Sequence, residues 1–396
     1  MKEVIGVVGQ GYVGLPLALE ISRNGFSVIG IDTNQKLVDS LNNGHSFIED
    51  ISGEDILTEL EANRYKASTD YSLIKNCQII LVCVPTPLDG KAPDLKFLIH
   101  AASNIGYHLD KGDLVIVEST VEPETTRKIL LPILEKNSKL NRKDFFVAFS
   151  PERIDPTNQK WGIKNTPKLI AGFNQESKLK AMEFYSKFVD TVVGCDSLEI
   201  AESAKLLENS FRLINISFVN EFSIFCQKLG IELNDVIKAA STKPYGFMPF
   251  YPSVGVGGHC IPVDPLYLAN KAREIGAPTR FIDLADQINQ EMPGYFVGRA
   301  EEKIGGIKGK KILVIGVSYK PNVADVRETP VEALLLGLKN KGAQVSWHDD
   351  LVKEWNGEKS VAISDKYDLA ILATPHAYID LTKLGHVPIL NTRGSI

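Results

Sequence analysis

The chain has 396 residues, enough for two or three domains of about 150 residues each and for a well-buried core. Apolar residues make up 44% of it and charged residues 23%, an ordinary globular composition that excludes disordered and fibrous classes. The 44 Lys and Arg against 49 Asp and Glu give a net charge of -5, so we expect no nucleic-acid partner.

Hydropathy and cysteine usage narrow the class further. No apolar run approaches the roughly 20 residues that span a bilayer, so we expect no membrane partner. The five cysteines show no C-x-x-C spacing, which fits a reducing cytoplasm and indicates neither a disulfide framework nor a metal site.

The N-terminal part of the chain alternates between apolar strands and helices. The β-branched run Val4–Val8 predicts a strand, and Leu15–Arg23 predicts the helix after it. The next strand, Phe26–Ile31, ends in Asp32. Further apolar runs with helical stretches between them are Gln78–Val84, Leu114–Glu118 and Phe145–Phe149. Such alternation indicates a parallel, doubly wound sheet.

A glycine-rich loop, G-Q-G-Y-V-G, joins the first strand to the first helix. Its first glycine makes the tight turn, the second lets a pyrophosphate approach the backbone, and the third lets the helix pack on the strand. The carboxylate of Asp32, 18 residues after Gly14, suits the hydroxyls of the adenosine ribose. No arginine follows it to hold a 2′-phosphate, so the pattern favours NAD over NADP. A turn without a ligand is the alternative. The expected cofactor contacts are Gly9, Gly11, Tyr12, Val13, Gly14 and Asp32.

Residues 196–229 contain neither glycine nor proline. Asp196 with Glu199 forms a plausible capping box, and Gly230 is a good helix stop. We therefore predict one helix of about 30 residues, about 45 Å long, as a spine between two domains.

The strand pattern returns after helical material that extends to about residue 303. The expected strands are residues 312–315, 345–347, 369–372 and 388–390. The fold class is therefore α/β. We predict an N-terminal Rossmann-type doubly wound domain (1–195), a helical middle with the spine helix (196–303) and a C-terminal Rossmann-like α/β domain (304–396).

Cys260 lies in the most unusual stretch of the sequence. Three glycines within residues 255–258 let the backbone approach another group closely and place the thiol on an exposed turn. From the residues alone, a nucleophile and a packing role are about equally supported for Cys260. For the other four cysteines, a buried packing role is the better interpretation.

Other polar residues fall where ligands are expected. Lys205 and Asn209 are four residues apart on the spine helix and so share a face. Either the pair stabilises an oxyanion, or this is simply a solvated face of the helix. Ser119 and Glu152 follow strands, at the edge where open α/β sheets bind ligands. His259 has no ligand partner at metal-binding spacing and is a structural or substrate-contacting neighbour.

Taken together, these residues resemble the nucleotide-sugar 6-dehydrogenase family (UDP-glucose/GDP-mannose dehydrogenases). The matching segments occur in family order over almost the whole chain: Gly9–Leu15, Val84–Pro87, Glu118–Thr120, Ser150–Arg153, Lys205–Asn209, Gly257–Cys260, Tyr319–Pro321, Asp325–Arg327 and Asn391–Gly394. The chain stops at Ile396, where relatives usually continue with a terminal helix, so we expect a shorter nucleotide-binding domain.

The resemblance implies an enzyme that oxidises a sugar C6 alcohol to a carboxylate with two NAD⁺. It implies that Cys260 is the nucleophile, that Asp264 and Thr120 hold a water as the first base, and that Glu152 assists thioester hydrolysis. Lys205 and Asn209 stabilise the oxyanion. Further cofactor contacts are Pro85, Thr86, Ser119, Thr120 and Arg327. The implied substrate contacts are Glu152, Arg153, Lys205, Asn209, Tyr251, Ser253, Gly255, Gly257, His259, Tyr319, Lys320 and Arg393.

The substrate branch is indicated by two positions near the cysteine. The UDP-glucose and GDP-mannose branches typically show Ser before the Cys and Lys before the Asp, whereas this chain has His259 and Val263. Together with Lys243–Pro252, these positions resemble the UDP-N-acetylhexosamine branch, with UDP-N-acetylglucosamine favoured. UDP-N-acetylmannosamine and UDP-glucose are the alternatives.

Two other classes compete with this interpretation. A non-catalytic NAD-binding or nucleotide-sugar-binding protein would be marked by loss of Cys260, Lys205 or Asn209, and all three are present. A two-electron dehydrogenase of the 6-phosphogluconate type needs no nucleophilic cysteine and is separated by its NADH stoichiometry.

The spine helix also predicts assembly. Its apolar residues exceed what its own chain covers, so we expect a homodimer or higher homo-oligomer built on the helical middle. The residues concerned are Leu206, Leu213, Phe218, Phe222 and Phe225.

Overall fold

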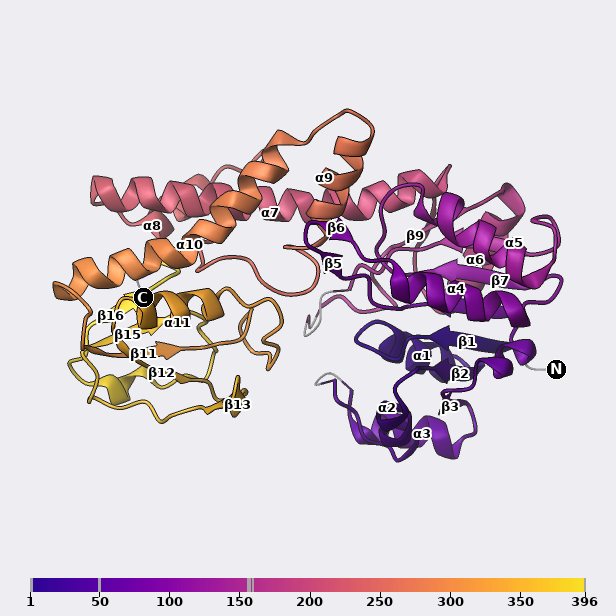
Figure 1. The fold of residues 1–396 in the computed structure, drawn as a ribbon, viewed down its shortest axis with the longest axis horizontal. Coiled ribbons are helices and arrows are strands. Elements are labelled where there is room, and N and C mark those ends of the chain that lie inside the picture. Colours follow the sequence, from indigo (N-terminus) through magenta and orange to yellow (C-terminus); the bar gives the residue numbers. More distant parts are fainter. Residues whose placement is uncertain (1–2, 49–50, 155–157, 159, 395–396) are drawn as a thin grey trace. The chain divides into compact units, whose positions relative to one another are not determined.

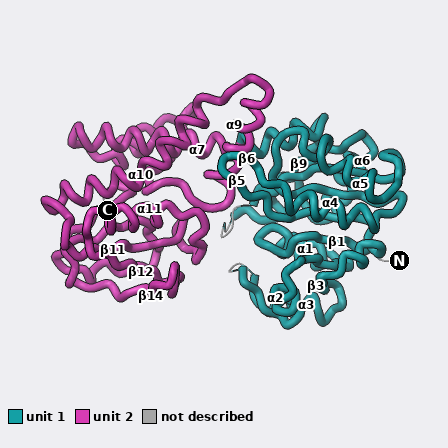
Figure 2. The backbone as a smooth tube through the Cα atoms, viewed as in Figure 1, with its two compact units in different colours: residues 1–207 teal, residues 208–396 magenta. Residues whose placement is uncertain are grey.

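The largest sheet of the computed structural model has eight strands in the order β10-β9-β8-β7-β4-β1-β2-β3 (Figure 1). Their bounds are β1 Val4–Val8, β2 Ser27–Ile31, β3 Tyr65–Ser68, β4 Ile79–Val82, β7 Leu114–Val117, β8 Phe146–Phe149, β9 Lys168–Gly172 and β10 Val192–Gly194. The central strands are apolar and buried on both faces, as parallel strands covered by helices must be. The structure describes residues 3–48, 51–154, 158 and 160–394, and it divides into unit 1, residues 1–207, and unit 2, residues 208–396 (Figure 2).

Helices cover both faces of this sheet in unit 1. Ile5 and Val7 of β1 belong to one apolar core with α1, and Val8 belongs to a second core with α4 and α5. This alternation along one strand is the doubly wound arrangement that the sequence predicts. The helices are α1 Gly14–Arg23, α2 Gln35–Asn42, α3 Gly53–Glu61, α4 Lys96–His108, α5 Leu131–Ser138 and α6 Gln175–Ser186.

The sheet is not parallel throughout. Strand β9 pairs antiparallel with β8, and β10 pairs parallel with β9. Where the structure describes the connection between β8 and β9, it forms turns and no helix, so the chain reverses direction instead of crossing over. The predicted parallel, doubly wound sheet is confirmed from β8 through β3, and β9 and β10 at this edge run in the opposite direction.

The long helix is present as α7, Leu198–Leu229, which has 32 residues. It ends as predicted before Gly230, whose φ is +75°. Its predicted start is wrong by one residue, because the hydroxyl of Ser197 accepts from the N–H of Ile200 at 3.2 Å. Glu199 instead forms an ion pair with Arg127, with 2.5 Å between the charged atoms. The boundary between the two units falls within α7.

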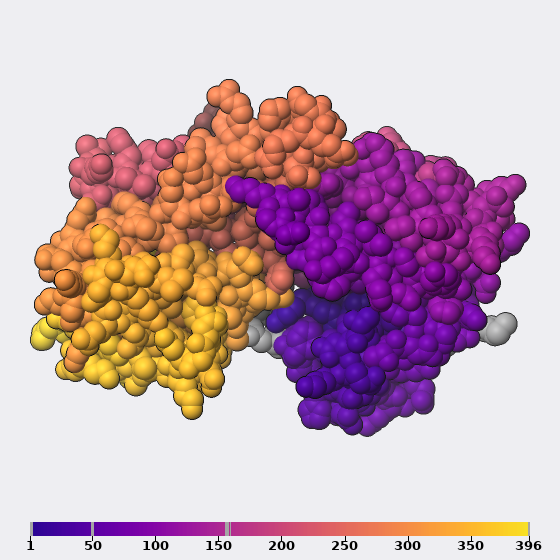
Figure 3. All heavy atoms as spheres, viewed as in Figure 1, coloured from indigo at the N-terminus to yellow at the C-terminus, as the bar shows by residue number. Residues whose placement is uncertain are grey.

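Unit 2 contains a second, smaller parallel sheet in the order β12-β11-β15-β16. Its strands, β11 Lys311–Ile315, β12 Gln344–His348, β15 Leu369–Leu372 and β16 Ile389–Asn391, confirm the predicted runs. Trp347 is buried between this sheet and α10 and α11 in one apolar core. In the space-filling view these C-terminal residues, orange to yellow, form one closely packed body (Figure 3). The helices of unit 2 beyond α7 are α8 Leu233–Ala240, α9 Asp264–Glu274, α10 Arg280–Ile304 and α11 Val331–Asn340.

Minor elements complete the description. Short antiparallel hairpins join β5 Leu88–Asp89 to β6 Ala92–Pro93, and β13 Glu354–Trp355 to β14 Glu358–Lys359. Every helix in the described part of the chain is too short or too polar to traverse a lipid bilayer. The division into three domains at residues 195 and 303 stays a prediction.

Candidate active site

The glycine loop after β1 has the geometry of a phosphate cradle. Gly9 has φ +91°, and a Cβ there would lie 2.6 Å from the carbonyl oxygen of Cys83. A Cβ on Gly14 would lie 1.7 Å from the carbonyl oxygen of Gly9, so no side chain fits where α1 meets the loop. Gly11, in contrast, faces open space within 4 Å. The first and third glycines are thus required by packing, and the second leaves room for a ligand.

Asp32 holds this loop against the end of β2. One of its carboxylate oxygens accepts from the backbone N–H of Gln10 at 2.8 Å, and the other from that of Asn34 at 2.9 Å. The fully buried Gln10 side chain accepts from the Tyr65 hydroxyl at 2.8 Å and donates to the Val7 carbonyl. Burial and the charge of Asp32 raise the pKa of Tyr65, which keeps its hydroxyl protonated as a donor. The sequence analysis missed the supporting roles of Gln10 and Tyr65.

The predicted cofactor residues after β4 and β7 lie side by side. The hydroxyl of Thr86, which follows Pro85, donates to the carbonyl of Thr120 at 2.8 Å. The hydroxyl of Ser119 donates to the carbonyl of Val84 at 2.7 Å. These bonds tie together two neighbouring strand ends, as the paired strands β4 and β7 require.

A buried ionic cluster lies at the ends of β7 and β8 and the start of β9. The Lys168 ammonium is 2.6 Å from a Glu118 oxygen and 3.0 Å from a Glu152 oxygen. The hydroxyl of Tyr185, on α6, donates to Glu118. Burial raises the pKa of Glu118 to about 7. Burial also opposes ionisation of Glu152, but Lys168, a backbone N–H and Lys205 hold its pKa below the usual value.

This cluster contains one predicted site residue, Glu152, and the charge of a second, Lys205, reaches it. Lys205 lies on α7 and is 8% exposed. The predicted neighbour Arg153 donates to the Pro167 carbonyl at 2.8 Å. Lys168 and Tyr185 were missed, because a single lysine before an apolar strand and a single tyrosine on a helix carry no sequence signal.

Cys260 lies in unit 2, on an exposed bend directly before α9. Its carbonyl accepts from the N–H of Asp264 at 2.8 Å, which fixes the cysteine to the first turn of the helix. The preceding Gly258 has φ +85°, and a Cβ there would lie 2.7 Å from the Tyr319 ring. A Cβ on Gly257 would lie 2.5 Å from the carbonyl of Glu328. Close backbone approach therefore places the thiol, as the glycine pattern predicts.

The predicted pair Asn209 and Asp264 is in direct contact. The Asn209 amide donates to an Asp264 oxygen at 2.5 Å, and the two side chains are nearly buried. This bond links α7 to the N-terminus of α9, where a carboxylate is favoured by the helix dipole. The sequence placed both residues in the site but did not predict the contact.

His259 and Arg327 belong to one group of interacting side chains. The Arg327 guanidinium pairs with Asp325, and the Arg327 carbonyl accepts from the N–H of Gly258 at 3.2 Å. Burial and the charge of Arg327 lower the pKa of His259, so its ring is neutral near pH 7. Burial raises the pKa of Asp325, but the bonds to Arg327 more than offset this and hold it below the usual value.

The remaining predicted substrate residues lie in several loops of unit 2. Tyr251 is 53% exposed, and the Ser253 hydroxyl donates to the Gly255 carbonyl at 3.0 Å. Lys320 follows Tyr319 in the loop after β11. Arg393 is partly buried, and its Nε makes no hydrogen bond to any residue that the structure describes. A buried, unsatisfied guanidinium N–H of this kind suits an anionic ligand.

The loop after β11 is held by an aspartate at the end of β12, as the loop after β1 is held by Asp32. Asp349 accepts from the N–H of Val317 at 2.9 Å and from Nε2 of His376 at 3.0 Å. His376 and Asp349 have fully buried side chains, so this aspartate is closed to a ribose. In the described part of unit 2, the aspartate that matches Asp32 in position is therefore closed to a dinucleotide ribose.

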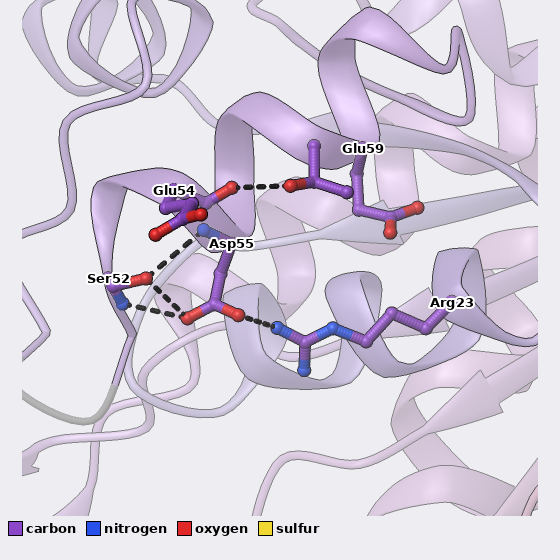
Figure 4. A pocket seen from close by; sticks show the side chains of 6 residues that line it. Arg23, Ser52, Glu54, Asp55 and Glu59 are labelled. Carbon is purple, nitrogen blue, oxygen red and sulfur yellow. Dashed lines mark hydrogen bonds and ion pairs between the residues drawn. The ribbon is translucent and has the colours of Figure 1, made fainter.

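A polar pocket in unit 1 is explained by local structure (Figure 4). Asp55 receives hydrogen bonds from the N–H and hydroxyl of Ser52, and it pairs with Arg23 at 2.5 Å. This is the capping box of α3 with one added ion pair. Across the described residues, no three histidine, cysteine or acidic side chains gather as a metal site.

The chain matches the models of three domains of one family. They are the NAD binding domain (residues 3–189), the central domain (199–291) and the UDP binding domain (313–392) of the UDP-glucose/GDP-mannose dehydrogenase family. The chain thus carries an NAD-binding domain, and its glycine cradle and Asp32 fit that cofactor.

Individual relatives agree with this match. The chain is 35% identical over 392 residues to a UDP-N-acetyl-D-glucosamine 6-dehydrogenase of Pseudomonas aeruginosa, covering 95% of this chain and 92% of the relative. It is 35% identical to a UDP-N-acetyl-D-mannosamine dehydrogenase of Methanococcus vannielii, covering 87% and 79%. The solved UDP-D-ManNAc dehydrogenase of Pyrococcus horikoshii has a TM-score of 0.90 at 29% identity, covering 98% of this chain and 95% of that one.

The glycine loop generates a paired prediction. Gly11→Ala is expected to leave the free energy of unfolding within about 1 kcal/mol of wild type, because its Cβ meets open space. If Gly11 borders the pyrophosphate, as the loop motif predicts, the same methyl takes up space that the ligand needs, so NAD⁺ affinity is expected to fall about tenfold, or about 1.4 kcal/mol. Gly14→Ala is expected to lower both quantities. Calorimetric titration with NAD⁺ and denaturant unfolding measure them, and unchanged affinity in Gly11→Ala would contradict the assignment.

Proposed function

The chain belongs to the UDP-glucose/GDP-mannose dehydrogenase family, and from this premise we propose that it oxidises the C6 hydroxyl of a UDP-N-acetylhexosamine to the uronic acid. UDP-N-acetylglucosamine is the favoured substrate. The observation that carries the proposal is the exposed Cys260, at the head of a helix whose first residue, Asp264, is hydrogen-bonded to Asn209. A thiol presented in this way is placed for covalent chemistry on an aldehyde.

The overall reaction removes four electrons from C6. One R–CH2OH, two NAD⁺ and one water give R–COO⁻, two NADH and three H⁺. When bound, NAD⁺ accepts a hydride in each of the two oxidation steps. The glycine loop and Asp32 hold the cofactor, with Pro85, Thr86, Ser119, Thr120 and Arg327 as the other proposed contacts.

Cys260 makes the second oxidation possible. An aldehyde in its planar form needs an added nucleophile before its carbon can give up a hydride. In the proposal, the Cys260 sulfur forms a bond to C6 and the oxygen becomes an oxyanion, which is the thiohemiacetal stage. Loss of hydride gives a thioester, and water then displaces the thiolate to release the acid.

Polar neighbours move the protons and stabilise the charge. In the proposal, Thr120 and Asp264 hold the water that takes the proton of the C6 hydroxyl. Lys205 and Asn209 donate to the oxyanions, each such donor contributing about 2.7–4 kcal/mol. Glu152 is the base for the hydrolytic water, supported by the low pKa that Lys168 and Lys205 give it.

The C-terminal α/β part is proposed to hold the uridine diphosphate. Support comes from the buried Asp349–His376 pair, which closes the place where a second dinucleotide would bind. Lys320 and Arg393 supply charge for the phosphates, and Tyr319, the residue before Lys320, is a further proposed contact. Glu152, Arg153, Tyr251, Ser253, Gly255 and Gly257 are the further proposed substrate contacts.

His259 and Val263 carry the choice of sugar branch. UDP-N-acetylmannosamine is the second candidate, because relatives with either name are 35% identical to this chain. UDP-glucose is the third. We propose that the product serves as an amino-uronic acid for a surface polysaccharide, and that the enzyme works in the cytoplasm, where NAD⁺ and nucleotide sugars are supplied.

A homodimer is proposed on α7. Phe211, Phe218 and Phe225 are spaced by seven residues and are 45%, 63% and 54% exposed, so they form one apolar stripe. Phe222 stacks between Phe218 and Phe225, with ring centroids 6.2 and 5.4 Å apart. Leu206 and Leu213 are buried, which corrects their predicted place in this stripe. A second copy of α7 suits such a surface.

The substrate assignment is tested by a panel of UDP- and GDP-sugars. UDP-N-acetylglucosamine or its 2-epimer is expected to turn over with two NADH per sugar. UDP-glucose is expected to be poor, because a pocket shaped for the acetamido group leaves polar groups unpaired at about 1–3 kcal/mol each. NADH absorbance and product mass measure this. Equal turnover of UDP-glucose would reject the branch, and one NADH per sugar would reject the four-electron reaction.

The thioester mechanism is tested at Cys260. Cys260→Ala is expected to lose uronate formation while keeping slow reduction of supplied aldehyde by NADH, because only the second oxidation requires the thiol. Cys260→Ser is expected to trap an ester, since an alkoxide leaves less readily than a thiolate. Intact-protein mass and NADH stoichiometry measure these outcomes. The control is Cys226→Ala at a buried site, expected to cost stability only. Near-normal uronate formation by Cys260→Ala would show the mechanism to be wrong.

The dimer is tested by charge on the stripe. Wild type is expected to sediment at twice the chain mass, and Phe218→Glu with Phe225→Glu at the chain mass, because two buried carboxylates oppose association. Phe281→Glu, at a side chain 75% exposed on α10, is the control and keeps the wild-type state. A wild-type monomer at every concentration would contradict the proposal.

A further inference from the structure

Lys168 is buried at the junction of three strands and bonded to two carboxylates. Its side chain is 6% exposed, while those of Glu118 and Glu152 are 0% and 14% exposed. An unpaired charge in such a place is very costly, so the three groups must be arranged together. Glu152 is the member that reaches solvent.

Both oxygens of Glu152 are engaged. One accepts from the Lys168 ammonium at 3.0 Å. The other accepts from the backbone N–H groups of Arg153 at 2.6 Å and Ile154 at 2.7 Å. The carboxylate plane is therefore fixed by three hydrogen bonds, and about one of the roughly four acceptor sites of an ionised carboxylate remains for a water.

Lys168 is itself held from the other side. Glu118 accepts from it at 2.6 Å, and Glu118 also accepts from the Tyr185 hydroxyl on α6. The Lys168 ammonium also lies 5.4 Å from the centre of the Tyr185 ring. These contacts place the ammonium without using any group of Glu152.

We propose that Lys168 is a positioning residue for Glu152, and that Glu118 and Tyr185 hold Lys168 in place for that role. This inference rests on the proposed function, in which Glu152 is the base for thioester hydrolysis. Lys168 touches no substrate and acts through Glu152. It fixes the direction of the carboxylate and keeps it ionised at the pH of the reaction.

The charges around Glu152 determine what removal of Lys168 does. Lys168 from β9 and Lys205 from α7 favour the ionised form of Glu152, together with the backbone N–H of Ile154. Burial and the facing carboxylate of Glu118 from β7 oppose it. Without Lys168 these opposing factors gain weight, so Glu152 takes up a proton at higher pH than in wild type.

The experiment compares pH profiles of kcat for uronate formation. Lys168→Met is expected to move the acid limb upward by about one pH unit or more and to lower kcat with little change in KM. Lys168→Arg keeps the charge and is expected to restore most of the acid limb. Glu118→Gln removes a negative charge and is expected to leave the acid limb in place or move it downward.

A matched control separates positioning from stability. Arg64→Met removes the partner of Glu59, whose side chain is 2% exposed, from a 2.8 Å ion pair beside β3 at the opposite edge of the sheet. It is expected to lower the free energy of unfolding and to leave the pH profile unchanged. If Lys168→Met does not fold, the pH profiles of Lys168→Arg and Glu118→Gln still test the positioning role of Lys168.

The outcomes distinguish this inference from the proposed function. An acid limb that stays in place in Lys168→Met, or that moves upward in Glu118→Gln, would overturn the positioning role. If wild type formed no uronate from any nucleotide sugar, the proposed function would fall first. In an active enzyme, an upward shift of the acid limb in Lys168→Met without an upward shift in Glu118→Gln would support the inference.

Discussion

The Lys168 ammonium pairs with the carboxylates of Glu118 and Glu152 at the point where β7 and β8 end and β9 begins. Parallel strands bring their carboxyl ends to one edge of a sheet, so polar side chains at successive strand ends are forced together. At this edge the antiparallel β9 adds a strand start, and it is this reversal that brings a lysine to face two glutamates. A fully parallel sheet would put the start of β9 at the far edge, with no cation for Glu118 and Glu152.

In both α/β parts an aspartate supports the glycine loop, but the two aspartates differ in their accessibility. In each, an aspartate after the second strand of the motif accepts from the backbone of the glycine loop: Asp32 from Gln10, and Asp349 from Val317. Asp32 remains partly accessible, whereas Asp349 is buried against His376, whose other nitrogen accepts from the N–H of Asn322. With Nδ1 accepting that bond, Nε2 is the ring nitrogen that donates to Asp349. A closed carboxylate supports the loop but cannot bind a ribose. Two α/β parts that share this support for the loop therefore need not both bind a dinucleotide.

Strong local patterns made most of the fold predictable. The strands at Val4–Val8 and Ile312–Ile315 are apolar runs beside glycine turns, and the end of α7 is a simple glycine stop. The short β3, with the sequence Y-K-A-S, was not predicted as a strand, because its lysine and serine interrupt the apolar pattern expected of a strand paired with β2. The reversed direction of β9 was not predicted, because the direction of a strand depends on the connection before it and not on the strand's own residues.

The candidate site was predictable where a motif carries the chemistry. The Gly9–Gly14 loop and Cys260 can be found this way, because each needs unusual backbone geometry and therefore unusual glycines. Lys168 and Tyr185 could not be found, since their roles exist only through burial against Glu118. The burial of Leu206 and Leu213 could not be found either. Both lie on the inward side of α7, and which side faces inward depends on residues far away in the chain.

Desolvation also separates four of the five cysteines from Cys260. Desolvation raises the pKa of the Cys77 thiol to about 12, and it raises those of Cys83, Cys195 and Cys226 as well. Because the thiolate is the nucleophile, a raised pKa makes each of these four less reactive at neutral pH than a free thiol. Cys260 differs in its backbone, since two glycines before it pack against Glu328 and Tyr319 at distances that no side chain would permit. The bend that results leaves Cys260 exposed. Among the five thiols, Cys260 is exposed, Cys195 is partly buried, and Cys77, Cys83 and Cys226 are buried.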